Sequence, residues 1–568
     1  MKNLLLNLWG YLSLKRKKQA IFLIIFSIIT SSFEVLTIGS IFNLLSVVTN
    51  NDLDLNSDLD NTFYFLDLDF SSQNIFLIFT IFLIFACISR VILLWCMLRF
   101  SHVVGCDMGV LMFTKTLKQP LEFYFKTTTT EIISNLTKKI HILSLEIVHP
   151  IILVLSNLII IIGVIGFLLF KIGIKVLLVF GIFVTLFYIF WKLTKSKIEK
   201  NSKHISVNSD LLIKNISEAI KAIKLISMRQ IYSFFTDQFD KTNRKLKFAE
   251  GDNVFLSQSI RIWLELVIIL FGTIFCLIAY KIGILPKIIP ILGGVVFGVY
   301  RIIPLLLKAY SGFSTLMGAK ESFVDILSYL NLDINKKTNL KKETNLSFKE
   351  EIKLIGLSYS YSGKKKSGVY GIDCSIRKNQ ITGIIGTTGS GKTTLISLIS
   401  GLMKPSQGFL VVDKQKLELG HINSWKNLIS YVPQETIILN SSITDNITLG
   451  LNKNVNEIKL IKALKAVNLD KFIPYINSKA MIGESGIKIS GGEKQRIGLA
   501  RALYDDREII ILDEPFSALD KDTAQRVLKN IRNFKKYTVI IVTHDSFVVP
   551  FCDNVITLKD GKVTRNSV

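Results

Sequence analysis

The chain has 568 residues, and 49% of them are hydrophobic, which is too many for an ordinary soluble enzyme of this length. It carries 69 Lys and Arg against 44 Asp and Glu, a formal net charge of +25. Such a charge fits either a nucleic-acid-binding protein or a membrane protein with basic cytoplasmic segments. The apolar residues come in long runs before about residue 320, and in pieces the size of one strand or helix after 350.

The distribution of the charge favours a membrane protein. Residues 49–74, between two long apolar runs, contain six Asp and neither Lys nor Arg, whereas residues 192–250 contain thirteen Lys and Arg against six acidic residues. Basic segments stay on the cytoplasmic side of a bilayer, so this asymmetry reports topology. We therefore expect no nucleic-acid partner and a location in the cytoplasmic (inner) membrane.

Residues 1–18 are predicted to form an interfacial helix at the membrane surface. Five apolar side chains can share one face of this helix: Leu4, Leu5, Leu8, Trp9 and Leu12. The basic run from Lys15 to Lys18 follows them. The segment is too polar to be a cleavable signal peptide.

Residues 19–325 are predicted to form a transmembrane domain with six spans. A span needs about 20 predominantly apolar residues. Six runs approach this length: 20–48, 75–98, 151–170, 174–191, 262–280 and 287–308. An even number of spans places both termini in the cytoplasm and the acidic segment 49–74 outside. The aromatic residues of that segment either touch a lipid tail or belong to an ordinary loop: Phe63, Tyr64, Phe65 and Phe70.

Two polar stretches are far longer than connecting loops need to be. They follow the second span, to about residue 147, and the fourth span, over about 192–258. We predict helices that continue into the cytoplasm and turn back near Pro120–Tyr124 and near Ser227–Gln230. These bends either dock on a soluble domain or are merely solvated helical hairpins.

Residues 326–350 are predicted to be a linker, because residues 331–350 are polar and charged. Residues 351–568 alternate short strands and helices like an α/β domain. There, an apolar strand, a glycine-rich loop and a helix follow one another, as a phosphate-binding loop requires. The loop comprises Gly386, Thr387, Thr388, Gly389, Ser390, Gly391, Lys392, Thr393 and Thr394. Its backbone N–H groups suit phosphates, while Lys392 would reach the β- and γ-phosphates and Thr393 would ligate Mg²⁺. The predicted ligands are ATP and Mg²⁺.

Two further motifs follow in this domain. Residues 489–496 read Ile-Ser-Gly-Gly-Glu-Lys-Gln-Arg, similar to the signature motif of ABC transporters, and the apolar strand 509–512 ends in Asp513-Glu514-Pro515. With the phosphate-binding loop and the spans, they make nearly the whole chain resemble an ABC exporter half-transporter. The resemblance implies an α-helical membrane domain of exporter type followed by an α/β P-loop ATPase domain. It also implies a homodimer, because each ATP binds between the phosphate-binding loop of one subunit and the signature of the other.

The resemblance implies catalytic roles for residues that match the family's motifs. Asp513 would hold Mg²⁺, Glu514 would orient or deprotonate the attacking water, and His544 would contact the γ-phosphate. Gln434 would contact Mg²⁺ and relay the state of the nucleotide to the membrane half. Tyr361 would stack on adenine, although Tyr359 competes for this role.

Other matches imply contacts across the dimer. Ser490, Gly491, Gly492 and Glu493 belong to the signature that faces the partner's ATP, and the loop that ends in Asp520 would cross the interface. Residues 483–486 resemble the exporter-specific loop that touches the membrane bends. Glu493 replaces the usual glutamine of the signature, and nucleotide binding is expected to survive because Ser490 and Gly491 make the γ-phosphate contacts.

Charged residues inside spans are costly and are therefore candidates for function. The substrate candidates are Glu34, Arg90, Arg261, Glu265 and Arg301. They either line a cavity, where guanidinium suits a phosphate-bearing head group, or pair internally, as the spacing of Arg261 and Glu265 allows. The sequence around them resembles bacterial flippases of lipid-linked oligosaccharides.

We therefore expect ATP-driven export or flipping of an amphipathic, anionic, lipid-linked substrate. A peptide, lipid or drug exporter of the same architecture is the alternative. A soluble ABC ATPase acting on DNA or ribosomes would not need the spans, and an ATP-gated channel would tolerate the loss of Glu514.

Overall fold

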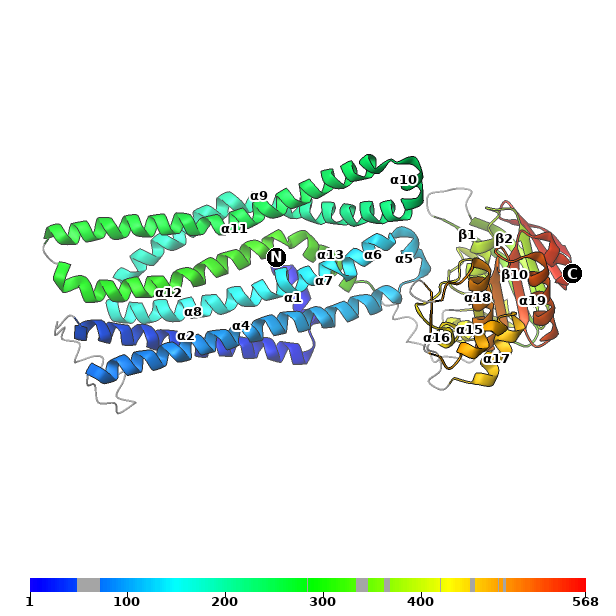
Figure 1. The fold of residues 1–568 in the computed structure, drawn as a ribbon, viewed down its shortest axis with the longest axis horizontal. Coiled ribbons are helices and arrows are strands. Elements are labelled where there is room, and N and C mark those ends of the chain that lie inside the picture. Colours follow the sequence, from blue (N-terminus) through cyan, green and yellow to red (C-terminus); the bar gives the residue numbers. More distant parts are fainter. Residues whose placement is uncertain are drawn as a thin grey trace. The chain divides into compact units, whose positions relative to one another are not determined.

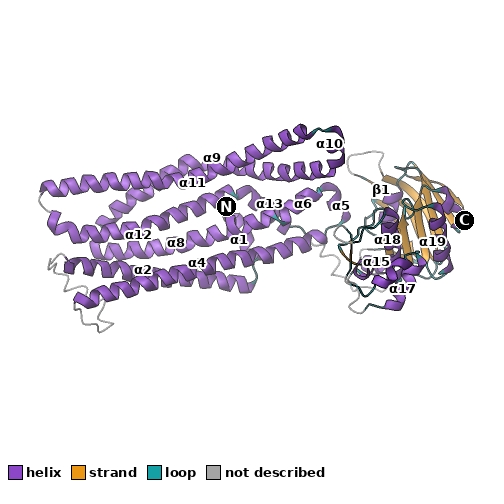
Figure 2. Cartoon of the chain, viewed as in Figure 1, coloured by secondary structure: helices purple, strands orange, loops and turns teal. Residues whose placement is uncertain are grey.

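The computed structural model describes residues 1–48, 72–282, 285–333, 346–361, 368–418, 420–449, 455–478, 480–483 and 487–567. Most of the acidic segment 49–74, with its aromatic residues, lies outside the described residues, as do positions 484–486 of the expected exporter-specific loop. The chain divides into two compact units, Met1–Gln119 with Tyr124–Ile334 and Pro120–Phe123 with Asn335–Val568. Figure 2 shows that the first unit is helical and that the second carries the strands.

Long helices that run side by side form most of the first unit (Figure 1). They are α1 (Lys2–Tyr11), α2 (Leu14–Val48), α4 (Ser72–Leu117), α5 (Leu121–Lys126), α6 (Thr129–Leu136), α7 (Lys138–Ile142), the π-helix η2 (Leu143–Val148), α8 (His149–Ile172), α9 (Lys175–Lys221), α10 (Ile223–Arg229), α11 (Tyr232–Ile282), α12 (Leu285–Gly318) and α13 (Lys320–Leu330).

The predicted spans fall within α2, α4, α8, α9, α11 and α12, but their number is not confirmed as six. Among the described residues, four helical segments are long and apolar enough to cross a membrane: Leu14–Phe42, Phe76–Leu117, Thr129–Lys171 and Tyr232–Ile274. A fifth is counted if Tyr300–Gly318 and Lys320–Leu330, which meet at 59°, form one bent span. The long polar continuations predicted for the second and fourth spans are present as the ends of α4 and α9.

The ends of the first unit differ from the predicted boundaries. The backbone is extended at Leu12, so α1 stops at Tyr11 and the basic run that begins at Lys15 lies in α2. At the other end, α13 passes residue 325 and continues to Leu330 because its buried face, which includes Phe323, packs into the unit. The Tyr11 hydroxyl lies 2.5 Å from Oδ1 of Asn331 and joins these two ends.

Two close helix packings shape the first unit. The helices α2 and α8 approach closely, since a Cβ on Gly163 would lie 2.1 Å from Oγ of Ser31. The helices α9 and α11 form an antiparallel pair with α10 at its turn (Figure 1). Polar contacts fix this pair, including the hydrogen bond of 3.0 Å from Asn201 Nδ2 to Asn253 Oδ1.

The second unit contains a six-stranded sheet, a four-stranded antiparallel sheet and a two-stranded ladder. Their strands are β1 (Glu351–Ser360), β2 (Gly368–Arg377), β3 (Ile381–Gly386), β4 (Gln407–Val412), β5 (Gln415–Lys416), β6 (Ile429–Val432), β7 (Ser441–Ser442), β8 (Met481–Ile482), β9 (Ile509–Asp513), β10 (Thr538–Thr543), β11 (Asn554–Lys559) and β12 (Lys562–Ser567). The strand orders are β12-β11-β3-β10-β9-β6, β2-β1-β4-β5 and β7-β8.

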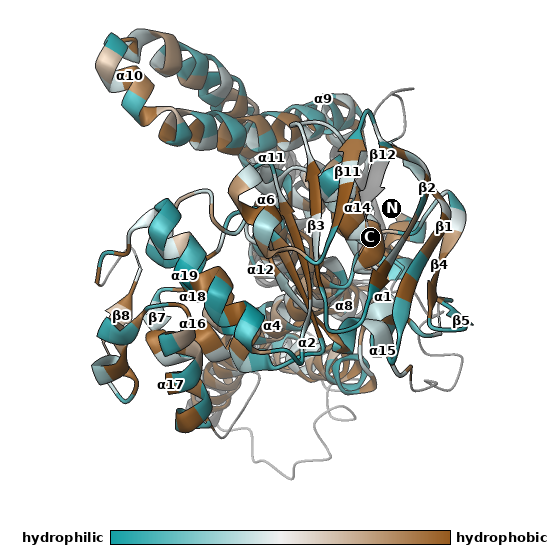
Figure 3. Cartoon of the chain, turned by 90° about the vertical axis from the view of Figure 1, so that its right-hand side faces the viewer, coloured by the Kyte–Doolittle hydropathy of each residue, from teal (hydrophilic) through white to brown (hydrophobic). Residues whose placement is uncertain are grey.

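Helices and the smaller sheet bury both faces of the six-stranded sheet. The helices are α14 (Lys392–Ile399), α15 (Ile422–Asn427), α16 (Ile443–Thr448), α17 (Glu457–Ala466), η4 (Asp470–Tyr475), α18 (Gly491–Asp505), α19 (Lys521–Asn533) and η5 (Ser546–Phe551). Alternate residues of β9 serve two cores, with Ile510 facing the helices α17, α18 and α19 and Ile511 facing α14 and the smaller sheet. A parallel strand buried on both faces is a continuous apolar run, which is why a central strand such as β3 is coloured mostly as hydrophobic in Figure 3.

Candidate functional site

The loop between β3 and α14 has the backbone shape of a phosphate cradle. Gly389 and Gly391 have φ values of +84° and +100°, a region that favours glycine. A Cβ on Gly386 would lie 2.4 Å from the carbonyl oxygen of Leu558, and one on Gly391 would lie 2.8 Å from Cγ1 of Val369. Conformation and space therefore both require the glycines of this motif.

Lys392 begins α14, and its side chain bonds back to the start of the loop. Its Nζ donates hydrogen bonds to the carbonyl oxygens of Gly386, at 2.7 Å, and Thr387, at 3.1 Å. Ser390 Oγ is buried and has no hydrogen-bond partner among the described residues. A buried ammonium and a hydroxyl without a partner, in a loop that leads into a helix N-terminus, fit the phosphates of a nucleotide.

The predicted adenine residues lie close to this loop. Thr388 precedes the two glycines with positive φ, while Thr393 and Thr394 lie in the first turn of α14. The Tyr361 hydroxyl is 3.2 Å from Oγ1 of Thr394. The rings of Tyr361 and Tyr359 meet edge to face with their centroids 5.2 Å apart. Both tyrosines therefore stay candidates for the base contact.

Asp513 ends β9 in a buried position. Its side chain accepts a hydrogen bond of 3.3 Å from the Tyr431 hydroxyl on the adjacent strand β6. Burial is the main cause that raises the pKa of Asp513, and the hydrogen bond from Tyr431 opposes the rise. Gln434, two residues beyond the end of β6, is exposed, and no hydrogen bond within the described part of the chain joins its side chain to Asp513.

The chain leaves the strand at Glu514. Adjacent residues of a strand point to opposite faces, so Asp513 and Glu514 can serve one site only if the strand ends between them. Glu514 has φ +46°, and its N–H donates to the carbonyl oxygen of Val542 at 2.8 Å, which ties the turn to β10. Its Oε2 lies 2.9 Å from Nδ1 of His544. The hydrogen bond with Glu514 raises the pKa of His544. A carboxylate and an imidazole are thereby held together at the carboxyl edge of the parallel sheet, where α/β folds bind ligands.

The signature residues form the first turn of α18. Ser490 is the N-cap: its Oγ accepts the Glu493 N–H at 3.3 Å, and Oε2 of Glu493 accepts the Ser490 N–H at 2.9 Å, which makes a capping box. Gly491 and Gly492 lie between them, and a Cβ on Gly492 would lie 2.9 Å from the carbonyl oxygen of Ala518. The capping box explains how glutamate is accommodated at this position.

Two residues that the motif analysis did not assign also hold this turn. Nζ of Lys471, in η4, contacts the other carboxylate oxygen of Glu493. Gln495 Nε2 donates to Ser517 Oγ at 2.7 Å, while Gln495 Oε1 accepts the Ala518 N–H at 2.9 Å. Gln495 stands inside the signature run and could have been noticed there, whereas Lys471 carries no sequence signal.

Asp520 caps α19 in the structure. Its Oδ2 accepts the Thr523 N–H at 2.9 Å, and this bond lowers the pKa of Asp520. The predicted interface loop therefore ends in a helix cap, which fixes the direction in which the chain leaves that loop.

Three of the charged residues in the spans form one cluster around the buried Glu34, with Arg301 11% and Arg90 33% exposed. Glu34 of α2 is 1% exposed, and its Oε1 lies 2.6 Å from Nε of Arg90 on α4. Its Oε2 lies 3.5 Å from Nη1 of Arg301 on α12. The Arg301 guanidinium also lies over the Phe297 ring, 5.3 Å from its centroid. These three residues therefore pair with one another, and the cluster holds two cations and one anion.

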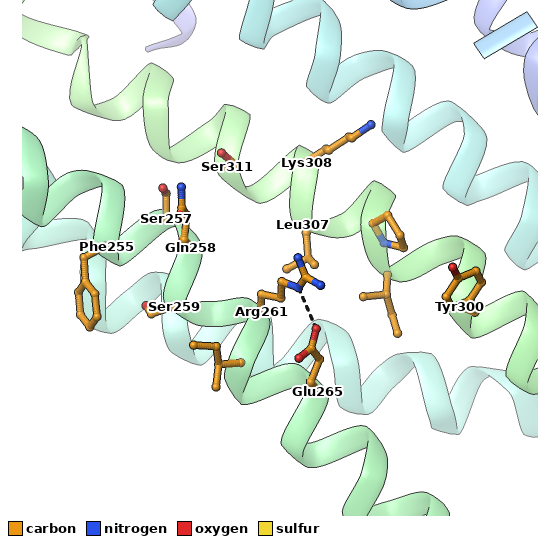
Figure 4. A pocket seen from close by; sticks show the side chains of 13 residues that line it. Phe255, Ser257, Gln258, Ser259, Arg261, Glu265, Tyr300, Leu307, Lys308 and Ser311 are labelled. Atoms are coloured by element: carbon orange, nitrogen blue, oxygen red, sulfur yellow. Dashed lines mark hydrogen bonds and ion pairs between the residues drawn. The ribbon is translucent and has the colours of Figure 1, made fainter. Parts of the chain in front are cut away.

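The other two candidates pair with each other beside a cavity. Arg261 Nε lies 2.8 Å from Oε1 of Glu265, one turn away on α11. The pair lines a cavity of about 1010 Å³ between α11 and α12, with Tyr300 and Lys308 also in its lining. Figure 4 shows the pair and the side chains around it. The apolar part of the lining includes Phe255, Ile262, Ile303, Pro304 and Leu307. The cavity is amphipathic and carries one more cation than anion.

Comparisons with known proteins agree with this architecture. The family model described as ABC transporter transmembrane region matches residues 19–292, and the one described as ABC transporter matches residues 369–517. The chain belongs to the ABC transporters and has the domain arrangement of an exporter half-transporter, a transmembrane domain fused to a nucleotide-binding domain. The fold resembles the structure of a bacterial Atm1-family ABC exporter with ATP bound, with a TM-score of 0.77, 16% identity and coverage of 97% of this chain and 95% of that one.

Curated relatives match mainly over part of their length. A putative export ATP-binding/permease protein of Rickettsia bellii is 34% identical over 44% of this chain, which spans 43% of that relative. The multidrug resistance-like ATP-binding protein MdlA of Buchnera aphidicola is 27% identical, over 83% of this chain and 82% of the relative. The alpha-hemolysin translocation ATP-binding protein HlyB of Escherichia coli is 36% identical over 34% of this chain and 28% of the relative.

Proposed function

We propose that the protein is an ATP-driven exporter that works as a homodimer in the cytoplasmic membrane, with both termini in the cytoplasm. Its substrate is amphipathic and anionic, of the lipid-linked oligosaccharide type. The observation that carries the ATPase part is the turn after β9, where Glu514 leaves the strand at φ +46° and meets His544 at 2.9 Å. Phosphoryl transfer depends on such positioning and on charge stabilisation.

In this proposal, each side chain of the nucleotide site has one task. Lys392 binds the β- and γ-phosphates, and Glu514 orients or deprotonates the attacking water. His544 contacts the γ-phosphate while its other ring nitrogen holds Glu514. Thr393, Gln434 and Asp513 would hold a Mg²⁺ ion, which supplies neutralisation of charge at the β- and γ-phosphates.

The number of motifs supports a homodimer, and the surface of α11 is compatible with one. The chain has one phosphate-binding loop and one signature, so two copies complete two sites. The helix α11 exposes large apolar side chains, among them Ile262 at 69%, Trp263 at 61% and Ile269 at 64%. Lipid or a second subunit must cover such a surface in a stable protein. The bends near Pro120 and Ser227 would carry the closure of the nucleotide-binding domains to the spans.

An anionic substrate is supported by the two charge groups in the spans. The cluster of Glu34, Arg90 and Arg301 has a surplus of one positive charge in a buried position. A phosphate-bearing head group can compensate that charge, because the planar guanidinium matches phosphate oxygens in pairs. The apolar lining of the nearby α11–α12 cavity suits the hydrophobic part of the same molecule.

A peptide, lipid or drug exporter is the second candidate. The names of two relatives favour it, because one refers to multidrug resistance and one to translocation of alpha-hemolysin. The Arg261–Glu265 pair also leaves the α11–α12 cavity with few free charges, as a site for less strongly charged molecules would be.

The deciding experiment measures ATP hydrolysis by the purified protein in lipid nanodiscs, with and without a polyprenyl-pyrophosphate-linked glycan. We expect the glycan to stimulate hydrolysis, and Arg90→Gln or Arg301→Gln to abolish the stimulation. Arg244→Gln is the matched control, because Arg244 pairs with Asp240 on α11 at an exposed site. Hydrolysis that ignores the glycan but responds to peptides or drugs would favour the second candidate.

A further inference from the structure

The signature turn of this chain carries a negative charge at a position that faces phosphate in the proposed dimer. Glu493 is the third residue of α18, and its carboxylate stabilises the free helix through the capping box with Ser490. The same charge would repel the triphosphate that the turn is meant to approach, and the repulsion grows as water is excluded. A nearby cation could cancel the repulsion of the triphosphate while the carboxylate still caps the helix.

Lys471 lies where such a cation is needed. Its Nζ contacts Oε1 of Glu493, while Oε2 of Glu493 accepts the Ser490 N–H at 2.9 Å. Both carboxylate oxygens are thus engaged, and the Glu493 side chain is only 13% exposed. The carboxylate is turned back toward its own chain, and the cation beside it cancels its charge.

The segment that carries Lys471 is fixed against α18. The Lys471 ammonium lies 5.0 Å from the centroid of the Phe472 ring, and Phe472 is buried at 2% exposure. Arg496 of α18 donates from Nη1 to the carbonyl oxygen of Asn468 at 2.7 Å, just before η4. The helix and this segment are therefore connected at two points, by Lys471 with Glu493 and by Arg496 with Asn468.

We propose that Lys471 is a positioning residue of the signature motif, which neutralises Glu493 and holds it back so that Ser490, Gly491 and Gly492 can approach the triphosphate bound by the partner subunit. The inference rests on the proposed ATPase function. It accounts for a glutamate at a position where the family has glutamine.

The test is a double-mutant cycle on the full-length protein in nanodiscs, read out as kcat and KM for ATP. Lys471→Gln should raise KM about tenfold when Glu493 is present, because a like charge is then left at the phosphate site. In a Glu493→Gln background the same change should raise KM less than about twofold. Lys471→Arg, which keeps the charge, should restore most of the affinity, and higher ionic strength should reduce the Lys471→Gln defect.

The outcomes separate the inference from the function on which it rests. If Lys471→Gln changes KM less than twofold, or equally in both backgrounds, the positioning role is wrong while the ATPase stands. A structural role alone would lower the thermal midpoint of Lys471→Gln and leave its KM for ATP unchanged. If the wild-type protein does not hydrolyse ATP, or if Glu514→Gln does not abolish its hydrolysis, the proposed function is wrong and this inference fails with it.

Discussion

His544 Nδ1 lies 2.9 Å from Oε2 of Glu514, so the imidazole and the carboxylate that follow two neighbouring parallel strands form one pair. The backbone enforces this contact, because the Glu514 N–H is bonded to Val542 of the strand that leads to His544. The pair can therefore act together on one γ-phosphate and one water.

The first prediction concerns the carboxylate. Glu514→Gln should lower the rate of ATP hydrolysis at least about hundredfold, since a general base typically contributes 10²–10⁴-fold, while an ATP-bound dimer accumulates. Glu508→Gln is the matched control: it lies just before β9 and makes only a partly exposed ion pair with Lys378, so its rate should stay near that of wild type. Near-normal hydrolysis by Glu514→Gln would contradict the assignment.

The second prediction concerns the protonation of His544. Its hydrogen bond to Glu514 raises the pKa of His544, so the imidazolium should persist above the ordinary value of about 6.5. The contact contributes stability fully below about pH 6.5 and loses it as the pH rises through the raised pKa. Histidine NMR titration of the nucleotide-free protein should show this midpoint, and Glu514→Gln should lower it. An unchanged midpoint in that variant would place the cause elsewhere.

The third prediction concerns the buried charge cluster. Glu34→Gln should destabilise the protein by about 3–5 kcal/mol, because it leaves two guanidinium groups without their counter-charge in a low-dielectric place. The control is Glu265→Gln, which breaks the exposed Arg261 pair and should have a far smaller effect. Thermal unfolding in nanodiscs measures both. Equal midpoints for the two variants would mean that water reaches Glu34.

The fourth prediction concerns the phosphate-binding loop. Gly391→Ala should weaken ATP binding at least about tenfold, since the left-handed conformation costs a side chain about 1–2 kcal/mol and its Cβ would press on Val369 at 2.8 Å. Gly251→Ala, in α11 with open space around it, is the control and should bind ATP like the wild type. Fluorescent-nucleotide titration distinguishes them, and tight binding by Gly391→Ala would refute the loop geometry.

Sequence reasoning succeeded where a motif is local. The phosphate-binding loop, the Asp513-Glu514 edge and the signature turn are each contiguous, so the strand, turn and helix around them could be predicted with the fold class. The spacing of Arg261 and Glu265 likewise allowed the pair that the structure contains. Helix boundaries were less accurate, because tertiary packing extends α13 beyond the predicted end.

Pairings between distant segments could not be predicted. Glu34, Arg90 and Arg301 lie on three helices, and only the packing of α2 against α4 and α12 brings them together. Lys471 contacts Glu493 because η4 folds against α18, and no sequence pattern in either segment predicts this contact. A single sequence, read alone, offers no measure of such proximity.

The side chain of Gln495 connects two regions that serve different nucleotides in the proposed dimer. It holds α18, whose first turn would face the partner's ATP, to Ser517 and Ala518, which lie three and four residues after Glu514, the proposed catalytic carboxylate. In the proposed dimer, we therefore expect engagement of one ATP to alter the backbone beside the other. The two sites should show positive cooperativity, with a Hill coefficient for ATP above one that declines when Gln495 is shortened to alanine.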